Sequence, residues 1–400
     1  MNHRQTALGL IGYLFIGTAA VLVPLMMPFY DRGVCGHRHY VGRDRADLSG
    51  PIGGRILGNL LAGAGSDVFG RQRLVWMSAL LLAISLLLTA AVAPWLLFVV
   101  GFVVISAAQG ALSTGINAMV ADANPNTRGR ALNVLHGVYG AGAAVSPLVI
   151  GVLIERGMEW RGALVATGAI WLLYALAAWW FKDPTASVQQ IVAGWSLDLE
   201  MLRQPSFLSL FAIAFIYNGV AVSLLGWIAL YMQDSADVST FVAISMISIF
   251  YVALTAGRFA CAAFAERLGY AHLLLLLGIG AVLTYPMVIF GATSLVVAVG
   301  VFLVGLSLSG LFPTAIAYGT RLYPARAGAV SGMLSTALTL GAMLPPLWTG
   351  AIAATWGFQV ALGLNYIMVP PLVFLAIYLG RVEVRQTKPL EAYPNQARTG

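Results

Sequence analysis

Residues 63–73 read GAGSDVFGRQR, in which glycines flank an acid and two arginines follow, and they come directly after an apolar stretch. Residues 262–272, AAFAERLGYAH, repeat this arrangement 199 positions later, so that Glu266 stands where the first copy has Asp67. Further pairs at the same offset are Gly70 and Gly269, Pro125 and Pro324, Pro147 and Pro346, and Gly151 and Gly350. A register shared over this length predicts an internal duplication into two similar halves.

The composition places the chain in a lipid bilayer. Of its 400 residues, 60% are hydrophobic and 9% are charged, whereas about a quarter of the residues of a soluble domain are charged. Two cysteines, Cys35 and Cys261, cannot staple a chain of this length, so a secreted disulfide scaffold is excluded. The net charge of +7 does not indicate a nucleic-acid partner, because the Lys and Arg residues lie in loops between apolar runs.

Twelve apolar runs can each cross the hydrocarbon core, which takes about 20 helical residues. We predict spans at 7–30, 48–66, 74–93, 95–121, 131–154, 163–181, 207–232, 238–260, 271–293, 295–320, 327–352 and 358–380. Each half then holds six spans, and an even number brings both halves into the membrane from the same side. The expected fold is an all-α membrane protein of twelve transmembrane helices in two parallel six-helix repeats.

The polar stretch between the sixth and seventh spans divides the chain. We predict an N-terminal six-helix bundle at 1–181, a cytoplasmic linker at 182–206, a C-terminal six-helix bundle at 207–380 and a cytoplasmic tail at 381–400. Most Lys and Arg residues fall in the loops that share a side with both termini, and such loops are cytoplasmic as a rule. We therefore expect a multi-pass protein of the inner (plasma) membrane with both termini in the cytoplasm.

The start of the second span is unexpectedly polar. Residues 31–47 read DRGVCGHRHYVGRDRAD, and Arg55 interrupts the apolar run that follows. Charges at membrane depth cost several kcal/mol without partners. One hypothesis is a local reading-frame error whose effect ends by Gly58; the other is a genuine but short second span beginning at Leu48.

The G-x-x-x-D-x-x-G-R-x-R loop formed by Gly63, Asp67, Gly70, Arg71 and Arg73 resembles the signature of the major facilitator superfamily of transporters. Its place after the second of twelve spans fits, as do the weaker copy with Glu266 after the eighth span and the pair Trp160-Arg161 before the sixth. The resemblance implies a conformational role for the loop and for Glu266. It also implies transport by alternating access, in which two helix bundles rock around a central site.

Within the superfamily, the chain resembles the fucose-permease-like sugar transporters. The matching stretches are Asn133-x-x-His136-Gly137 with the glycines that follow, Tyr217-x-Gly219 with Trp227, and Ser309-Gly-Leu-Phe-Pro313-Thr314. This resemblance implies a sugar, polyol or similar small polar metabolite as the substrate, often carried together with a proton. The expected activity is therefore sugar symport.

Two departures from known patterns bear on that expectation. Drug-proton antiporters of the superfamily carry an Arg where this chain has Ser106, which weighs against a drug exporter. Sugar-type members often carry a Glu where this chain has Ala221, and no acid replaces it nearby. Proton coupling through a membrane-embedded carboxylate therefore has no candidate, and His136 is the one side chain inside a span that titrates near neutral pH.

A sugar-like solute needs hydroxyl and amide partners and an aromatic face. The candidates for substrate binding are the polar or aromatic residues at mid-span depth, Asn133, His136, Asn218, Trp227, Gln109, Asn117, Tyr139 and Asn365, with Tyr251 as a further one. Each of them alone could instead serve as a hydrogen bond between helices.

We expect no enzymatic activity, because no paired catalytic groups occur at membrane depth. We also expect no cofactor, no metal, no nucleic acid and a monomer whose partners are its solute, the bilayer and a coupling proton. The alternatives left open are an exporter of drugs or secondary metabolites and, in a different class, a transporter-like sensor or a membrane-embedded enzyme.

Overall fold

The chain forms a helical membrane protein, seen here in a computed structural model that describes residues 3–20, 44–92, 94–156, 159–181, 199–236 and 240–387. The first half consists of α1 (His3–Ala20), α3 (Asp44–Phe69), α4 (Arg71–Ala91), α5 (Trp95–Ala123), α6 (Arg128–Glu155) and α7 (Trp160–Trp180). The second half begins with a 3-10 turn, η1 (Leu199–Arg203), and continues with α8 (Pro205–Ala236), α9 (Thr240–Leu268), α10 (Tyr270–Phe290), α11 (Ser294–Leu308), α12 (Leu311–Leu322), η2 (Pro324–Arg326), α13 (Ala327–Trp356), α14 (Phe358–Tyr366) and α15 (Pro371–Thr387).

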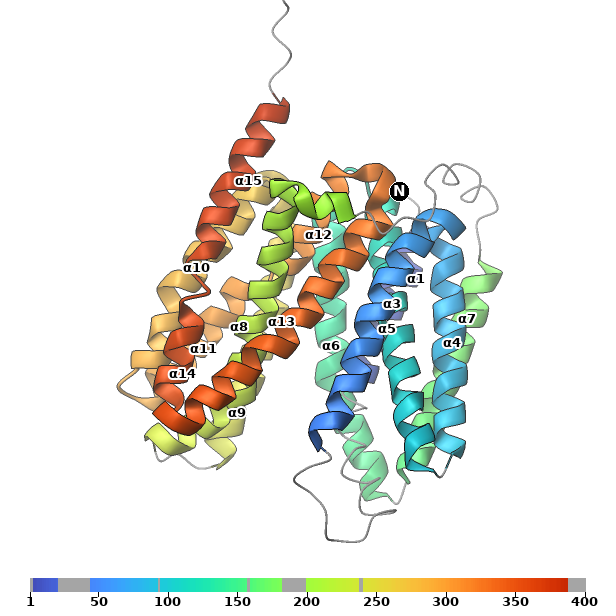
Figure 1. Ribbon diagram of the computed structural model, residues 1–400, viewed down its shortest axis with the longest axis horizontal. Helices are drawn as coiled ribbons and strands as arrows, with labels where there is room; N and C mark the ends of the chain where they lie inside the picture. The colour runs from blue at the N-terminus through green and yellow to red at the C-terminus, as the bar shows by residue number, and fades with distance from the viewer. Residues whose placement is uncertain are drawn as a thin grey trace, which may run out of the picture.

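These helices confirm the predicted architecture of twelve spans. Nine spans of the described chain are long and apolar enough to cross a membrane, as judged by length and composition. The helices α1, α3 and α6 complete the set. Figure 1 shows the helices of the first half gathered on the right, and α9, α10, α11, α14 and α15 of the second half on the left.

Two of the spans are broken, which the hydropathy pattern does not predict. The tenth span divides into α11 and α12 at Ser309 and Gly310, where a side chain on Gly310 would meet the Cys261 sulfur at 2.5 Å. The twelfth divides into α14 and α15 before Pro371, which starts α15 with the fixed φ that suits a first helical turn. Most other boundaries differ from prediction by a few residues, but α9 continues to Leu268, beyond residue 260, and α15 continues to Thr387, beyond residue 380.

The second span is a continuous helix over the part that the structure describes. Gly54 and Gly58 of α3 face the backbone of α5, where added side chains would collide with the carbonyl oxygens of Val103 and Ala107. Small residues four apart allow this kind of close helix contact in membranes. The segment before Gly58 therefore fits its place in the bundle, and Arg55 does not interrupt the helix. Residues 31–43 of the polar stretch lie outside the described residues, as do Cys35 and most of the proposed linker.

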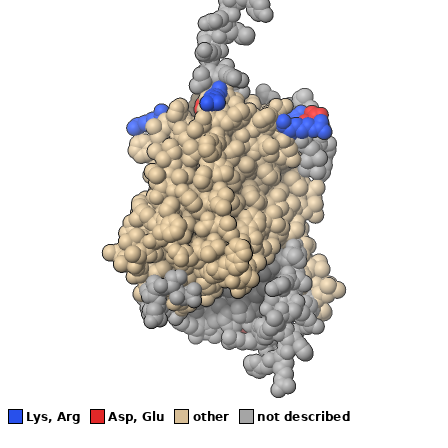
Figure 2. Space-filling view, turned by 60° about the vertical axis from the view of Figure 1, so that its left-hand side comes forward, with Lys and Arg blue, Asp and Glu red and all other residues tan. Residues whose placement is uncertain are grey.

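The outer surface agrees with a bilayer environment. Large apolar side chains such as Leu173, Leu283 and Phe374 are mostly exposed, at 68%, 69% and 71%. Figure 2 shows one side of the molecule, on which the Lys, Arg, Asp and Glu side chains gather at one end above a broad surface that carries none. The chain is therefore a multi-pass membrane protein whose apolar belt faces lipid.

Candidate functional site

A cavity of about 330 Å³ lies between the two halves. Helices α1, α3, α5 and α6 of the first half and α8, α9, α12 and α13 of the second contribute to its wall. It is lined by Tyr13, Ile16, Ile52, Arg55, Ser113, His136, Tyr139, Tyr217, Asn218, Ala221, Val222, Leu225, Phe250, Tyr251, Leu254, Arg258, Phe312, Leu338, Thr339 and Ala342. A larger groove of about 600 Å³ between α1 and α7 has mostly apolar walls and opens on the outer surface, so the central cavity is the place where polar groups converge.

Aromatic rings cross the cavity from one half to the other. The His136 ring packs edge-on against Tyr13 of its own half, with centroids 5.0 Å apart, and against Phe312 of the other half at 5.3 Å. Phe312 in turn stacks parallel to Tyr217, 6.4 Å away. The break between α11 and α12 starts a new helix at Leu311, just before Phe312, which lines the cavity.

Two arginines face the cavity, one from each half. Arg258 of α9 is only 5% exposed; its Nη1 donates to the carbonyl oxygen of His136 at 2.9 Å, and its Nη2 donates to the Tyr217 hydroxyl at 3.1 Å. Arg55 of α3 is half-buried. The ion pairs found among the described residues involve neither of them.

Four of the residues predicted from the sequence meet in this cavity. His136 and Tyr139 come from α6, Asn218 from α8 and Tyr251 from α9. Asn218 also donates to the carbonyl oxygen of Leu338 in α13, at 2.7 Å, so its amide is held in place by a backbone group. The His136 Nε2 is buried and has no hydrogen-bond partner among the described residues.

The remaining candidates are not among the residues that line the cavity. Asn133 donates to Gly129 O at 2.8 Å and to Thr314 Oγ1 of α12 at 3.4 Å. Asn365 donates to Thr349 Oγ1 at 2.7 Å and joins α14 to α13. Trp227 of α8 donates to the carbonyl oxygen of Pro346 in α13, and the buried Gln109 and Asn117 of α5 are not among the lining residues.

The lining residues that the sequence-based prediction did not propose for substrate binding include Arg55, Arg258 and Tyr13. The span predicted at 238–260 puts Arg258 near its end, whereas α9 continues to Leu268, so Arg258 lies deep inside the helix. The hydropathy pattern makes Arg55 an interruption rather than a lining residue. A charged residue inside an otherwise apolar span is a functional signal in itself, and that signal could have identified both arginines.

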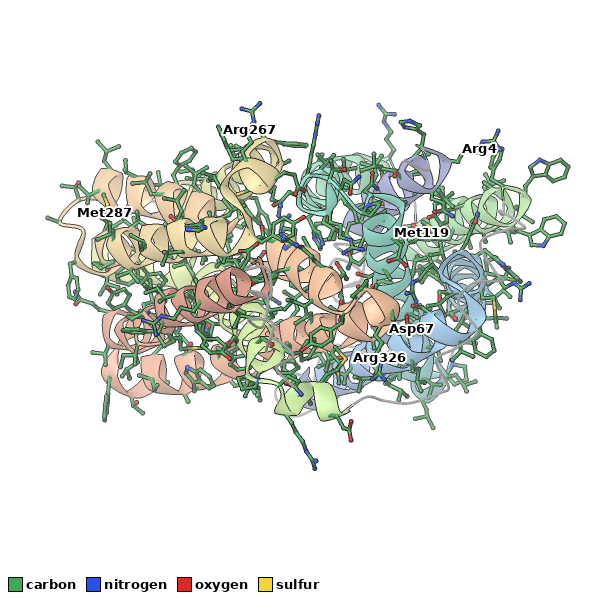
Figure 3. All side chains as sticks on the ribbon, turned by 90° about the horizontal axis from the view of Figure 1, so that it is seen from above. Arg4, Asp67, Met119, Arg267, Met287 and Arg326 are labelled. Carbon is green, nitrogen blue, oxygen red and sulfur yellow. The ribbon has the colours of Figure 1, made fainter. Side chains whose placement is uncertain are left out.

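The conformational motif joins the two halves through a contact, here called a clasp, between an acid at the end of one helix and the first turn of a helix in the other half. Asp67, at the end of α3, accepts hydrogen bonds from Arg71 and from the backbone amides of Gly328 at 3.1 Å and Ala329 at 2.9 Å, at the start of α13. A carboxylate is stabilised at a helix N-terminus, where amides are unpaired and the helix dipole is positive. Figure 3 looks onto this end of the molecule, with Asp67 beside Arg326, the residue that precedes α13.

Other members of the motif support this clasp. Arg71 donates through Nε to Asp122 at 2.8 Å and so ties α4 to α5. Gly63 lies against α13, where a Cβ added to it would come within 3.1 Å of the Gly328 carbonyl oxygen, a tight contact that the backbone of α13 would have to yield to. Gly70 has a φ of 90°, which only glycine adopts without strain. Arg73 follows in the first turn of α4.

The second copy of the motif forms the same contact with the roles of the halves exchanged, since its acid belongs to the second half and its partner helix to the first. Glu266 Oε1 accepts from the backbone amide of Arg130 at 3.1 Å, at the start of α6, and Glu266 Oε2 accepts from the Tyr270 hydroxyl at 2.9 Å. That hydroxyl accepts from the amide of Gly129 at 3.2 Å. Gly129 and Gly328 are themselves 199 residues apart, so the two clasps are related by the internal repeat. Arg128 adds a hydrogen bond across the halves to Thr320 O at 3.0 Å, so several contacts join the two halves at the motif end.

Sequence comparisons agree with this arrangement. The profile of the Major Facilitator Superfamily matches residues 48–346. A Bacillus subtilis (strain 168) protein described as the uncharacterized MFS-type transporter YfkL is 25% identical over 282 residues, which cover 69% of this chain and 71% of that protein.

Solved structures share the fold over nearly the whole chain. The E. coli fucose:proton symporter FucP is 16% identical, with a TM-score of 0.79 and coverage of 94% of this chain and 98% of its own. The human organic anion transporter MFSD10 is 17% identical, with a TM-score of 0.77 and coverage of 94% and 100%. The proton:xylose symporter XylE is 13% identical, with a TM-score of 0.75 and coverage of 94% of each chain. At these identities the likeness concerns the fold alone.

Proposed function

Given that the chain belongs to the major facilitator superfamily, we propose that it is a secondary transporter that moves a sugar, polyol or similar small polar metabolite by alternating access. The observation that carries the proposal is the cavity of about 330 Å³ between the halves, which combines polar groups with aromatic faces. Its volume lies at the small end of the range for ligand pockets, about 300–1,000 Å³. A small solute is therefore the expected cargo.

Specific side chains suit a hydroxylated solute. The His136 Nε2 has no partner among the described residues, and Tyr139, Tyr251 and Ser113 bring hydroxyl groups to the same wall. The stacked pair of Phe312 and Tyr217 offers apolar faces for the CH groups of a sugar ring. FucP and XylE, described as fucose:proton and proton:xylose symporters, make sugars the first class to test.

The two clasps support the alternating-access part of the proposal. Asp67 and Glu266 each bind the first turn of a helix in the other half, so breaking these contacts lets the halves separate at the motif end. We propose that this end faces the cytoplasm, in the inner membrane, with bundles at 1–181 and 207–380 moving about the linker at 182–206. The tail at 381–400 then lies on the same side.

The test is uptake of labelled fucose, xylose, glucose and mannitol into proteoliposomes, with and without an inward proton gradient. We compare the full chain with His136→Ala and with His272→Ala, since His272 is exposed and lies outside the cavity. Accumulation that needs the gradient, disappears in His136→Ala and persists in His272→Ala supports a proton symporter. Uptake that ignores the gradient identifies a uniporter, and no uptake of any solute overturns the sugar proposal.

A further inference from the structure

We propose that the transported solute carries an oxyanion group, a carboxylate or a phosphate, which binds between Arg55 and Arg258. The inference rests on the proposed function and narrows its substrate class. Arg55 comes from α3 of the first half and Arg258 from α9 of the second, and both line the central cavity. An anion bound there contacts both halves at once.

Arg258 is hydrogen-bonded, but no described acid forms an ion pair with it. Its partners are a backbone carbonyl oxygen, that of His136, and the Tyr217 hydroxyl, and both are neutral. Its Nε is buried and has no partner among the described residues. The two hydrogen bonds to neighbours fix the plane of the guanidinium. Its remaining N–H groups are therefore preorganised for binding a ligand.

The cavity contains no described acid that could neutralise the two cations. None of its lining residues is Asp or Glu. The ion pairs within the described residues are Arg71 with Asp67, Arg71 with Asp122 and Arg321 with Glu383. A buried charge without a counter-charge is costly, and arginines inside membrane helices mark ligand or ion pathways.

The internal repeat carries a neutral residue at the counterpart of each arginine. At the offset of 199 residues, Leu254 corresponds to Arg55 and Asn59 corresponds to Arg258. Asn59 serves as a structural link, donating to Thr339 at 3.3 Å. Each half therefore folds with a neutral residue at the position where the other half has an arginine, which indicates that the arginines are there for a ligand.

The guanidinium group suits an oxyanion by its geometry. Its planar fork of N–H donors matches two oxygens of a carboxylate or phosphate, and such charge-assisted bonds are about twice as strong as neutral ones. The rest of the wall, with Asn218, Tyr139 and Tyr251, provides partners for hydroxyl groups. Together these groups fit a small hydroxylated acid or a sugar phosphate better than a neutral sugar.

The experiment measures equilibrium binding to the purified full chain with three probes that share one pyranose ring. Glucose is neutral, glucuronate replaces its CH₂OH by a carboxylate, and glucose 6-phosphate adds a phosphate at the same carbon. We expect at least one of the anions to bind roughly tenfold or more tightly than glucose, the gain typical of one added charge-assisted hydrogen bond. A preference for glucuronate identifies the carboxylate, and a preference for glucose 6-phosphate identifies the phosphate.

Substitutions locate the effect. Arg55→Gln and Arg258→Gln should each abolish the anion preference, while Arg258→Lys, which keeps the charge but not the fork, should retain part of it. Arg156→Gln removes the same charge from an exposed position outside the cavity and should leave the preference intact. A cooperative thermal unfolding transition in detergent, compared with that of the unmodified chain, shows whether each variant is folded.

The outcomes separate this inference from the proposed function. Glucose binding as tightly as both anions overturns the anion inference and leaves the transport of neutral sugars standing. An anion preference that survives in both Gln variants overturns the assignment to these arginines. Failure of all three probes to bind overturns the sugar-like substrate class as well.

Discussion

Asp67 accepts from three donors at once, Arg71 in its own half and the amides of Gly328 and Ala329 in the other. Its carboxylate therefore sits where the positive end of α13 and a guanidinium overlap, and it is only 7% exposed. An amide side chain of the same size could accept fewer of these bonds and would bring its own N–H groups toward the same donors.

Asp67→Asn should loosen the start of α13. Hydrogen bonds to charged groups contribute about 1.5–3 kcal/mol each, so we expect roughly a tenfold or larger rise in the open population at this end. Hydrogen exchange of the Gly328 and Ala329 amides, followed by mass spectrometry, measures it. Glu383→Gln removes an acid paired with the exposed Arg321 and serves as the control, with a change below about 1 kcal/mol. Equal exchange in Asp67→Asn and the unmodified chain would contradict the clasp.

Asn365 and Asn218 should respond differently to substitution by alanine. Asn365 is fully buried and bonded to Thr349 and Trp348, so Asn365→Ala leaves buried groups unpaired and should lower stability by about 1–3 kcal/mol with solute affinity unchanged. Asn218 lines the cavity, so Asn218→Ala should weaken solute binding. Thermal unfolding in detergent and binding titrations of both variants test this, and a loss of affinity in Asn365→Ala alone would reverse the assignment.

At the scale of helices, α3 illustrates how little tolerance a close contact has. Gly58 lies against Ala107 of α5, where an added Cβ would collide with backbone atoms, whereas Gly53, five residues earlier, has no atom within 4 Å of the same position. Because the clashing atoms belong to the main chain of α5, the clash could be relieved only by a shift of a whole helix.

Gly58→Ala should therefore destabilise the protein by about 1–3 kcal/mol, the usual cost of overpacking. Gly53→Ala, the same change in the same helix, should be neutral or stabilising, because alanine favours helix over glycine by about 1 kcal/mol. Melting temperatures of the two variants in the same detergent provide the comparison. Equal melting temperatures would mean that α3 does not pack on α5 at Gly58, and would favour the hypothesis of a reading-frame error.

At the scale of helices, most of the fold could be predicted from the hydropathy of the sequence. Apolar runs fix where a chain crosses a bilayer, so the twelve spans and the duplication follow from the sequence. The breaks at Gly310 and before Pro371 do not, because a glycine or proline within a span is compatible with either a kink or an unbroken helix until its neighbours are known.

The candidate site is harder to predict, because facing the cavity is a property of packing. Asn133, Asn365 and Trp227 have the right chemistry and depth, yet their hydrogen bonds go to neighbouring helices. Arg258 is hidden by an error of eight residues in the end of its helix, predicted at 260 rather than at Leu268. Eight helical residues span about 12 Å along the axis. The prediction therefore places Arg258 at the membrane boundary, whereas the structure places it at the level of the cavity.

At the scale of the whole molecule, the distribution of charge predicts its orientation. The described surface in Figure 2 carries its Lys and Arg side chains at one end, and Arg71, Arg128 and Arg321 belong to the loops or helix ends around the clasps. The positive-inside rule assigns such an end to the cytoplasm.

A fluorescent-protein fusion placed after Gly400 should accordingly be fluorescent in a bacterial host, while an alkaline phosphatase fusion at the same place should be inactive, because that enzyme needs the oxidising periplasm. Fusions of the same reporters within the loop near Arg156 should give the opposite pattern. Active phosphatase at the C-terminus would invert the proposed orientation.

The reciprocity of the clasps has a consequence for the ancestry of the chain. Asp67 binds the helix that begins near Gly328, and Glu266 binds the helix that begins near Gly129, with each partner displaced by 199 residues. A contact in which patch meets patch and the roles then exchange is isologous, the kind found about the two-fold axis of a homodimer. Two copies of a single six-helix polypeptide could thus have formed this interface before a gene fusion joined them. In such a symmetric dimer both subunits would carry the same residue at each position, so an arginine present in one half only, such as Arg55 or Arg258, requires the fused chain.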